Sequence, residues 1–92
     1  DVVATAKRDL AVGEVLDGEG GYTVWGKLLP AQKSAQMGGL PLGLAHNVKM
    51  IRPVKKGESL TWSHVAMDTS APAYKVRKEM EKLFTPAMLK AA

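Results

Sequence analysis

The sequence predicts a mainly β domain with short helices and one longer helix at the C-terminal end. Short segments rich in β-branched residues recur along the chain and are separated by turns that contain glycine, which is typical of a β-rich fold. A segment near the C-terminus instead repeats its apolar residues at helical spacing. A chain of 92 residues forms one domain with a modest core, built mostly from Val, Leu, Met and Ala because aromatic residues are few.

Three segments have the composition of strands. Residues 2–7 alternate loosely between apolar and polar side chains, and residues 46–52 form a second clear candidate. Residues 22–25 form a shorter candidate, which follows a glycine-rich loop over residues 17–21. We therefore expect three strands, over residues 2–7, 22–25 and 46–52.

Each of the two longer strand candidates is followed by a similar turn sequence. Aligned without gaps, residues 8–16 and residues 52–60 share Arg, Gly, Glu and the final Leu, and an aliphatic residue follows two positions after each Arg. Glycine tolerates the positive φ that a tight turn can demand. We expect two pseudo-symmetric strand–turn units packed against each other. The aligned acids, Glu14 and Glu58, are interpreted as local hydrogen-bond acceptors rather than as a catalytic carboxylate pair.

Two short helical segments are predicted between the strands. Residues 30–37 begin with proline and have a helix-forming composition, and the glycines at 38–39 are expected to end this helix. Residues 62–67 predict one helical turn followed by a strand. Residues 40–45 are apolar but broken by proline and glycine, which predicts a buried connection or a contact surface.

Residues 70–84 are the strongest helix prediction in the chain, with Pro72 near the first turn and a new short turn expected at residues 85–86. The apolar residues of this helix form one stripe: Ala73, Val76, Met80, Leu83 and Phe84. Lys75 and Glu79 are spaced to pair weakly on its outer face. The stripe either covers the β core or packs on domains outside this chain, and the sequence leaves both arrangements open.

Composition and charge argue against several classes of function. Hydrophobic residues at 46% and charged residues at 24% fit an ordinary soluble domain rather than a disordered chain. Without cysteine the chain has no disulfide and no thiolate metal site. The net charge of +4 is interrupted by acids and lacks interleaved aromatic residues, so we expect no nucleic-acid partner. No apolar run has membrane length and no signal peptide is visible, so we expect a cytoplasmic protein without a membrane partner.

The sequence patterns of catalysis and cofactor binding are absent. Residues 18–23 approach a dinucleotide fingerprint but lack its last glycine, and no phosphate-binding Gly-Lys-Ser or Gly-Lys-Thr occurs. His64 and Asp68 are spaced to face one side of a helical turn, yet nothing supplies a third metal ligand. We therefore expect no catalytic residue, no cofactor-binding residue and no metal site in this chain.

The two turn sequences, the second continuing into Leu-Thr-Trp-Ser-x-Val over residues 60–65, resemble the SAF domain, also called the antifreeze-like or β-clip family. The resemblance covers roughly residues 1–68 and implies a compact β-clip fold with pseudo-two-fold strand–turn units. Residues 69–92 would then form a C-terminal helical extension, packed on this domain or on domains outside the chain.

The middle of the chain narrows this resemblance. Residues 22–28 and the segment Gly-Leu-Pro-Leu-Gly-Leu-Ala-His over residues 39–46 resemble the C-terminal SAF domain of certain bacterial NAD(P)-dependent oxidoreductases that are similar to homoserine dehydrogenase. This resemblance implies a parent enzyme whose N-terminal domain, outside this chain, binds NAD(P). A chain that begins within strand-like sequence agrees with a piece of a longer protein.

The expected role is a non-catalytic accessory domain that packs on the other domains of the parent chain, shapes its site or joins subunits of a homo-oligomer. The residues expected to make this contact are Trp25, Leu40, Leu42, Leu44 and His46. The alternative is a module that binds a small molecule, a sugar or sugar acid, near His46, Lys49 and Arg52. Ice binding and pilus or flagellar assembly are less favoured, because charges are many and no export signal is visible.

Overall fold

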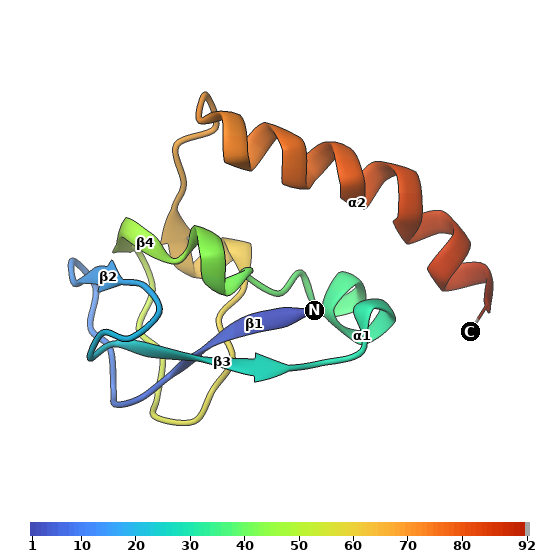
Figure 1. Cartoon of the computed structure of the whole chain (residues 1–92). Helices are drawn as coiled ribbons and strands as arrows, with labels where there is room; N and C mark the ends of the chain where they lie inside the picture. The colour runs from blue at the N-terminus through green and yellow to red at the C-terminus, as the bar shows by residue number, and fades with distance from the viewer. Residues whose placement is uncertain (92) are drawn as a thin grey trace.

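The computed structural model describes the backbone of residues 1–91 and the side chains of residues 1–83. A β-rich body precedes one long helix, which lies over it (Figure 1). The elements in chain order are β1 Val2–Ala6, β2 Val15–Asp17, β3 Val24–Leu28, α1 Ala31–Met37, the 3-10 helix η1 Leu42–Leu44, β4 His46–Met50, the 3-10 helix η2 Trp62–His64, β5 Val65–Ala66 and α2 Pro72–Ala91. The predicted β-rich domain with a C-terminal helix is confirmed.

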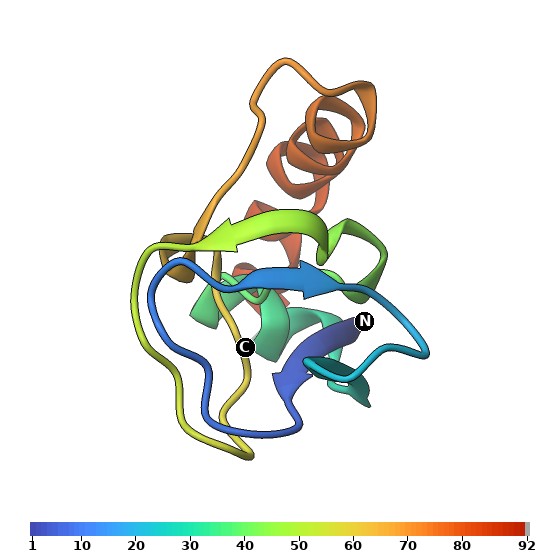
Figure 2. The ribbon, with the colours of Figure 1, turned by 90° about the vertical axis from the view of Figure 1, so that its left-hand side faces the viewer.

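The strands form two small antiparallel sheets. In the first, β1 pairs with β3, from Val2 opposite Leu28 to Ala6 opposite Val24. In the second, β4 lies between β2 and β5, and Figure 2 shows β2 and β4 side by side. The β2–β4 pairing is irregular, and Asn47 of β4 adopts a φ of 56° where the register shifts, as an extra residue in a bulge can do.

The core is built from the aliphatic residues that the composition predicts. Its members are Ala4, Ala6, Leu10, Leu16, Val24, Leu40, Leu42, Ala45, Val48, Met50, Val54, Leu60 and Val65. Trp62 of η2 packs against this cluster from the side of α2 and remains partly exposed. Leu40 and Ala45 are fully buried, so the apolar segment 40–45 is the buried connection that its sequence suggests.

The short helical predictions are confirmed, and one prediction for the long helix is wrong. Helix α1 ends at Gly38, whose φ of 69° is the left-handed conformation that glycine adopts readily. The helical turn η2 leads directly into β5, as residues 62–67 predict. Helix α2 does not end at Phe84 with a new turn over residues 85–86, because it continues to Ala91. Pro86 lies within α2. Proline has no backbone N–H, so one hydrogen bond of the helix is lost there, but its ring holds φ close to the helical value and the helix continues.

The two similar turn sequences pack against each other through reciprocal hydrogen bonds. The Leu10 N–H donates to the Val54 carbonyl over 2.8 Å, and the Val54 N–H donates to the Leu10 carbonyl over 3.0 Å. These residues are the aligned aliphatic positions of the repeat, and both are buried. Gly13 and Gly57, the aligned glycines, have φ values of 93° and 88°. Aligned residues therefore adopt equivalent conformations and bond to each other.

The aligned acids each serve their own turn. The Glu14 carboxylate accepts the Ala11 N–H over 2.6 Å, and the Glu58 carboxylate accepts the Lys55 N–H over 3.0 Å. Arg8 forms an ion pair with Glu14 over 2.7 Å. This ion pair and the hydrogen bond from the Ala11 N–H both lower the pKa of Glu14. The interpretation of these acids as local acceptors is confirmed.

Candidate docking surface on the C-terminal helix

Helix α2 contacts the β-rich body through an aromatic and polar face. Tyr74 meets Trp62 edge to face, with their ring centroids 5.5 Å apart. Nζ of Lys78 lies 4.0 Å from the centroid of the Trp62 ring, within the range of a cation–π interaction. Because Trp62 also packs against the core cluster, it links α2 to the body.

A network of charged groups holds the same face of α2. Arg77 donates hydrogen bonds of 3.1 and 2.5 Å to the Asp1 carboxylate, and that carboxylate also accepts the Ser34 hydroxyl over 2.6 Å. Arg77 pairs in addition with Glu81 over 2.8 Å. The side chains of Arg77 and Asp1 are each 16% exposed, so the network is largely shielded from solvent. It ties the start of the chain, α1 and α2 together.

The opposite face of α2 carries the apolar stripe, and this stripe is exposed. Val76 is 70% exposed, Met80 is 40% exposed and Leu83 is 68% exposed, and Ala73 is exposed beside them. The side chain of Phe84, also predicted to belong to the stripe, lies outside the described residues. The stripe therefore does not cover the β core, and α2 turns its polar and aromatic face inward, the reverse of an ordinary surface helix.

The 3-10 helix η1 borders the stripe and forms a shallow groove with α2. The groove has a volume of about 490 Å³ and is lined by Pro41, Gly43, Leu44, Ala73, Val76, Arg77 and Met80. A second depression of about 480 Å³ along α2 is lined by Lys75, Val76, Glu79, Met80 and Leu83. The two depressions share Val76 and Met80, so they form one continuous area. We call the residues Leu44, Ala73, Val76, Met80 and Leu83 the α2 surface.

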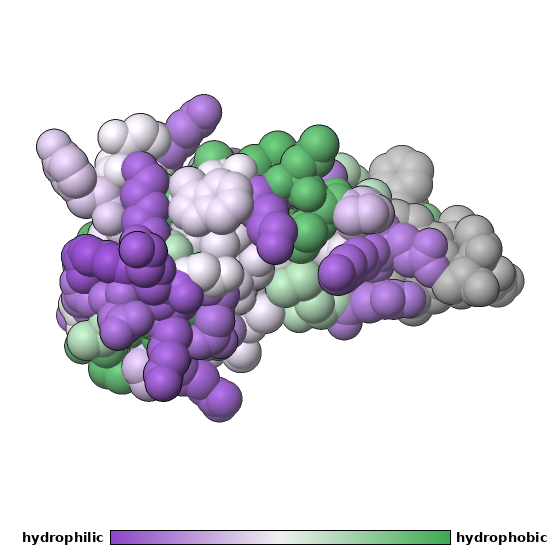
Figure 3. All heavy atoms as spheres, turned by 90° about the horizontal axis from the view of Figure 1, so that it is seen from below, coloured by the Kyte–Doolittle hydropathy of each residue, from purple (hydrophilic) through white to green (hydrophobic). Residues whose placement is uncertain are grey.

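A smaller exposed apolar area lies where β1 pairs with β3. Val2 and Leu28 are opposite each other in the register, and they are 44% and 78% exposed. Figure 3 shows hydrophobic surface gathered near the middle of the face seen from below, whereas hydrophilic side chains cover the end of the body on the left. Val12, Val15, Tyr22, Trp25 and Ile51 are exposed elsewhere on the described chain, outside both this area and the α2 surface.

The predicted contact residues of segment 40–45 are only partly at the surface. Leu40 is fully buried and Leu42 is 8% exposed, so both pack in the core of this chain and offer little surface to a partner. Leu44 is half-buried and lines the groove beside α2. The stripe of α2 is predicted by its helical spacing, but the contact residues were expected in segment 40–45 instead.

The other predicted residues lie outside the α2 surface. Trp25 is 43% exposed on β3, and His46 is an exposed polar residue that opens β4. Lys49 and Arg52, predicted with His46 for the small-molecule alternative, are exposed as well. None of these four residues lines the groove, the depression along α2 or the hollow that the two turns form.

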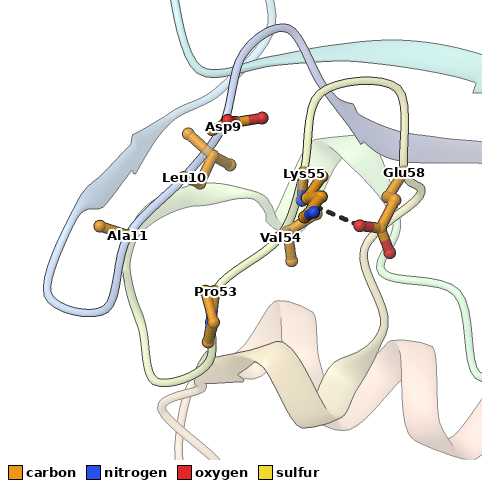
Figure 4. A pocket seen from close by; sticks show the side chains of 7 residues that line it. All are labelled: Asp9, Leu10, Ala11, Pro53, Val54, Lys55 and Glu58. Carbon is orange, nitrogen blue, oxygen red and sulfur yellow. Dashed lines mark hydrogen bonds between the residues drawn. The ribbon is translucent and has the colours of Figure 1, made fainter.

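The hollow between the two turns is lined mostly by groups that hold the turns together. It has a volume of about 440 Å³ and is lined by Asp9, Leu10, Ala11, Pro53, Val54, Lys55 and Glu58 (Figure 4). The Asp9 carboxylate accepts the Lys56 N–H over 2.9 Å, and Glu58 accepts the Lys55 N–H. Both acids in the hollow thus have structural roles in the turns.

One carboxylate organises the loop between β2 and β3. Asp17 accepts hydrogen bonds from the Thr23 hydroxyl, from the Tyr22 N–H over 2.7 Å and from the Thr23 N–H over 3.1 Å. These hydrogen bonds lower the pKa of Asp17 from 3.8 to about 2, and the bond from the Thr23 hydroxyl has the largest effect. Since the N–H groups of Tyr22 and Thr23 bond to this carboxylate, β3 begins at Val24 rather than at the predicted Tyr22.

The depressed pKa of Asp17 predicts a loss of stability in acid. A carboxylate whose pKa is lowered by folding stabilises the native state above its ordinary pKa of 3.8 and stops doing so as the pH falls toward about 2. Asp17→Asn is therefore expected to lower the unfolding temperature at pH 7 and to remove part of the fall between pH 4 and pH 2. Thermal unfolding across this range measures both effects, with Glu19→Gln as the control in the same loop. An unchanged pH profile in Asp17→Asn would contradict the assignment.

The described residues form no cluster suited to a metal ion. No group of three or more His, Cys, Asp or Glu side chains comes together among them. His64 instead accepts the Thr61 N–H through Nδ1 over 2.9 Å and so caps η2. Among the described residues, every helix is too short or too polar to span a lipid bilayer.

The α2 surface combines three exposed apolar side chains of one helix with a groove beside them, and we take it as the candidate site. The chain matches no family model and no curated protein sequence. Its function is therefore inferred from the exposed stripe of α2 and the groove beside it.

Proposed function

We propose that this chain is a non-catalytic accessory domain that docks through the α2 surface onto a second folded surface. The observation that carries the proposal is the outward apolar stripe of α2, with Val76, Met80 and Leu83 exposed. A helix already held by polar and aromatic contacts gains nothing from an apolar outer face unless another surface covers it. Covering these three partly exposed side chains would contribute on the order of 4 kcal/mol.

The sequence resemblance supplies the wider setting of this proposal. A β-clip fold of the SAF type over residues 1–68 is supported by the reciprocal hydrogen bonds of Leu10 and Val54. The parent protein is then an NAD(P)-dependent oxidoreductase similar to homoserine dehydrogenase, with NAD(P) bound by a domain outside this chain. In this setting residues 69–92 are the extension that packs on the catalytic domain or joins subunits.

A charged substitution within the stripe tests the docking role. Val76→Lys places an ammonium group in the middle of the α2 surface, and desolvating that group would oppose docking. We expect this variant of the 92-residue chain to bind several-fold less of a hydrophobic dye and to associate less in light scattering. Val12→Lys is the matched control, because Val12 is a 62% exposed valine in the first turn, outside the α2 surface.

The outcomes separate docking from general surface hydrophobicity. A loss of dye binding or association in Val76→Lys but not in Val12→Lys supports the proposal. A wild-type chain that stays monomeric and binds no dye contradicts it, and so do two variants that behave alike. Circular dichroism of both variants shows whether the fold is retained, so that a loss of binding is not mistaken for unfolding.

A further inference from the structure

The core of the β-rich body and the contacts of α2 are largely separate in this fold. From this we infer that α2 is a detachable strap, which leaves the body while the body itself stays folded. The inference concerns the inner face of α2 and goes beyond the docking role proposed for its outer face. It requires a core that does not depend on α2, a small number of anchors, and a hinge before the helix.

The core is formed without any described side chain of α2. All of its members lie between Ala4 and Val65, and the last partly buried residue packed against it is Met67. Of the α2 residues whose side chains are described, 72–83, none is buried. Since burial of apolar surface is what mainly holds a small domain together, undocking of this part of α2 leaves the core of the body intact.

The inner face of α2 meets the body at two anchors. Among the described residues, the hydrogen bonds, ion pairs and aromatic contacts between α2 and the body all reach Asp1 or Trp62. Arg77 binds the Asp1 carboxylate, whereas Tyr74 and Lys78 contact the Trp62 ring. Each of these three α2 side chains is only partly buried. Such a contact is more like one between two domains than like a core, and contacts of that kind open more readily.

The segment between β5 and α2 is suited to act as a hinge. Asp68, Thr69 and Ser70 are exposed. The Asp68 carboxylate accepts the N–H and the hydroxyl of Ser70, and the Asp68 carbonyl accepts the Ala71 N–H over 3.2 Å. These bonds stay within the segment and do not tie it to the body. Changes in a few backbone torsions over residues 68–71 are therefore enough to move α2.

Hydrogen exchange in increasing concentrations of urea tests the inference on the whole chain. An isolated helix of 20 residues is only marginally stable in water, so the amides of α2 exchange while it is undocked. We expect peptides of α2 to exchange through an opening that depends weakly on urea, because undocking exposes much less surface than unfolding of the body. Peptides of β1 are expected to exchange only through unfolding of the body, which depends steeply on urea.

Removal of one anchor is expected to act on α2 alone. Arg77→Gln removes the charge that binds Asp1, and it is expected to speed exchange in α2 about tenfold while exchange in β1 stays unchanged. Asp1→Asn is expected to do the same, although it leaves the pair of Arg77 with Glu81 in place. Lys75→Gln is the matched control and is expected to change neither rate. Lys75 is an exposed cation of the same helix and forms no ion pair among the described residues.

Either of two outcomes would overturn the inference. Peptides of α2 and β1 that exchange with the same dependence on urea would show one cooperative unit in which the helix does not detach. Exchange in α2 that is unchanged in both Arg77→Gln and Asp1→Asn would show that this anchor does not hold the helix. Neither outcome bears on dye binding through Val76, so the strap and the docking role can fail separately.

Discussion

Replacing Leu10 by Ala is expected to lower the free energy of unfolding by about 3 kcal/mol. Leu10 is 2% exposed, belongs to the core cluster, and exchanges backbone hydrogen bonds with Val54. The truncation leaves a cavity where the two turns meet, and the surrounding backbone is fixed by those bonds and cannot collapse fully into it. Urea unfolding followed by circular dichroism measures the change, which is a large fraction of the stability of a domain of this size.

The control for this truncation lies two residues away. Val12 is 62% exposed in the same turn, so Val12→Ala removes a valine side chain that contributes little to the core. We expect it to change the free energy of unfolding by less than about 0.5 kcal/mol. Equal losses in Leu10→Ala and Val12→Ala would mean that the turns are not held together through the core.

Replacing Trp62 by Ala is expected to free α2 from the body rather than to unfold the whole domain. Trp62 supplies both the aromatic contact with Tyr74 and the cation–π contact with Lys78. Losing these contacts of a partly buried ring is expected to cost about 2 kcal/mol of docking free energy, a roughly thirtyfold change in equilibrium. Hydrogen exchange measured on peptides of α2 should show this loss of protection, while peptides of β1 stay protected.

An exposed aromatic residue provides the comparison for Trp62. Tyr22 is 85% exposed in the loop before β3, and its backbone N–H, which bonds to Asp17, is retained in Tyr22→Ala. This variant is expected to leave exchange in α2 unchanged. If Trp62→Ala also leaves exchange in α2 unchanged, the network of Arg77 and Asp1 alone holds the helix.

The sequence predicted those parts of the fold that depend on local chemistry. Gly13 and Gly57 mark turns because the backbone there has positive φ, and Gly38 ends α1 for the same reason. The similar turn sequences predicted units that pack together, and Leu10 and Val54 make that contact. Local propensity is enough for these features because the residues that cause them lie within the turn itself.

The sequence could not predict which way α2 faces. Helical spacing places Val76 and Met80 on one side of the helix, but it cannot say whether that side meets the core. The orientation depends on contacts between distant residues, above all Arg77 with Asp1 and Tyr74 with Trp62. The burial of Leu40 and Leu42, which were predicted to contact a partner, depends on such distant contacts as well.

Each of the two turns bonds to the strand that precedes the other turn, although the two turns lie far apart along the chain. The Gly13 N–H donates to the Met50 carbonyl over 2.8 Å, and the Gly57 N–H donates to the Ala6 carbonyl over 2.9 Å. Neither turn can be finished until the intervening chain has closed into a long loop, whose entropic cost precedes any gain from contact. We therefore expect the β-rich body to fold slowly for its length and its two halves to unfold in one cooperative transition.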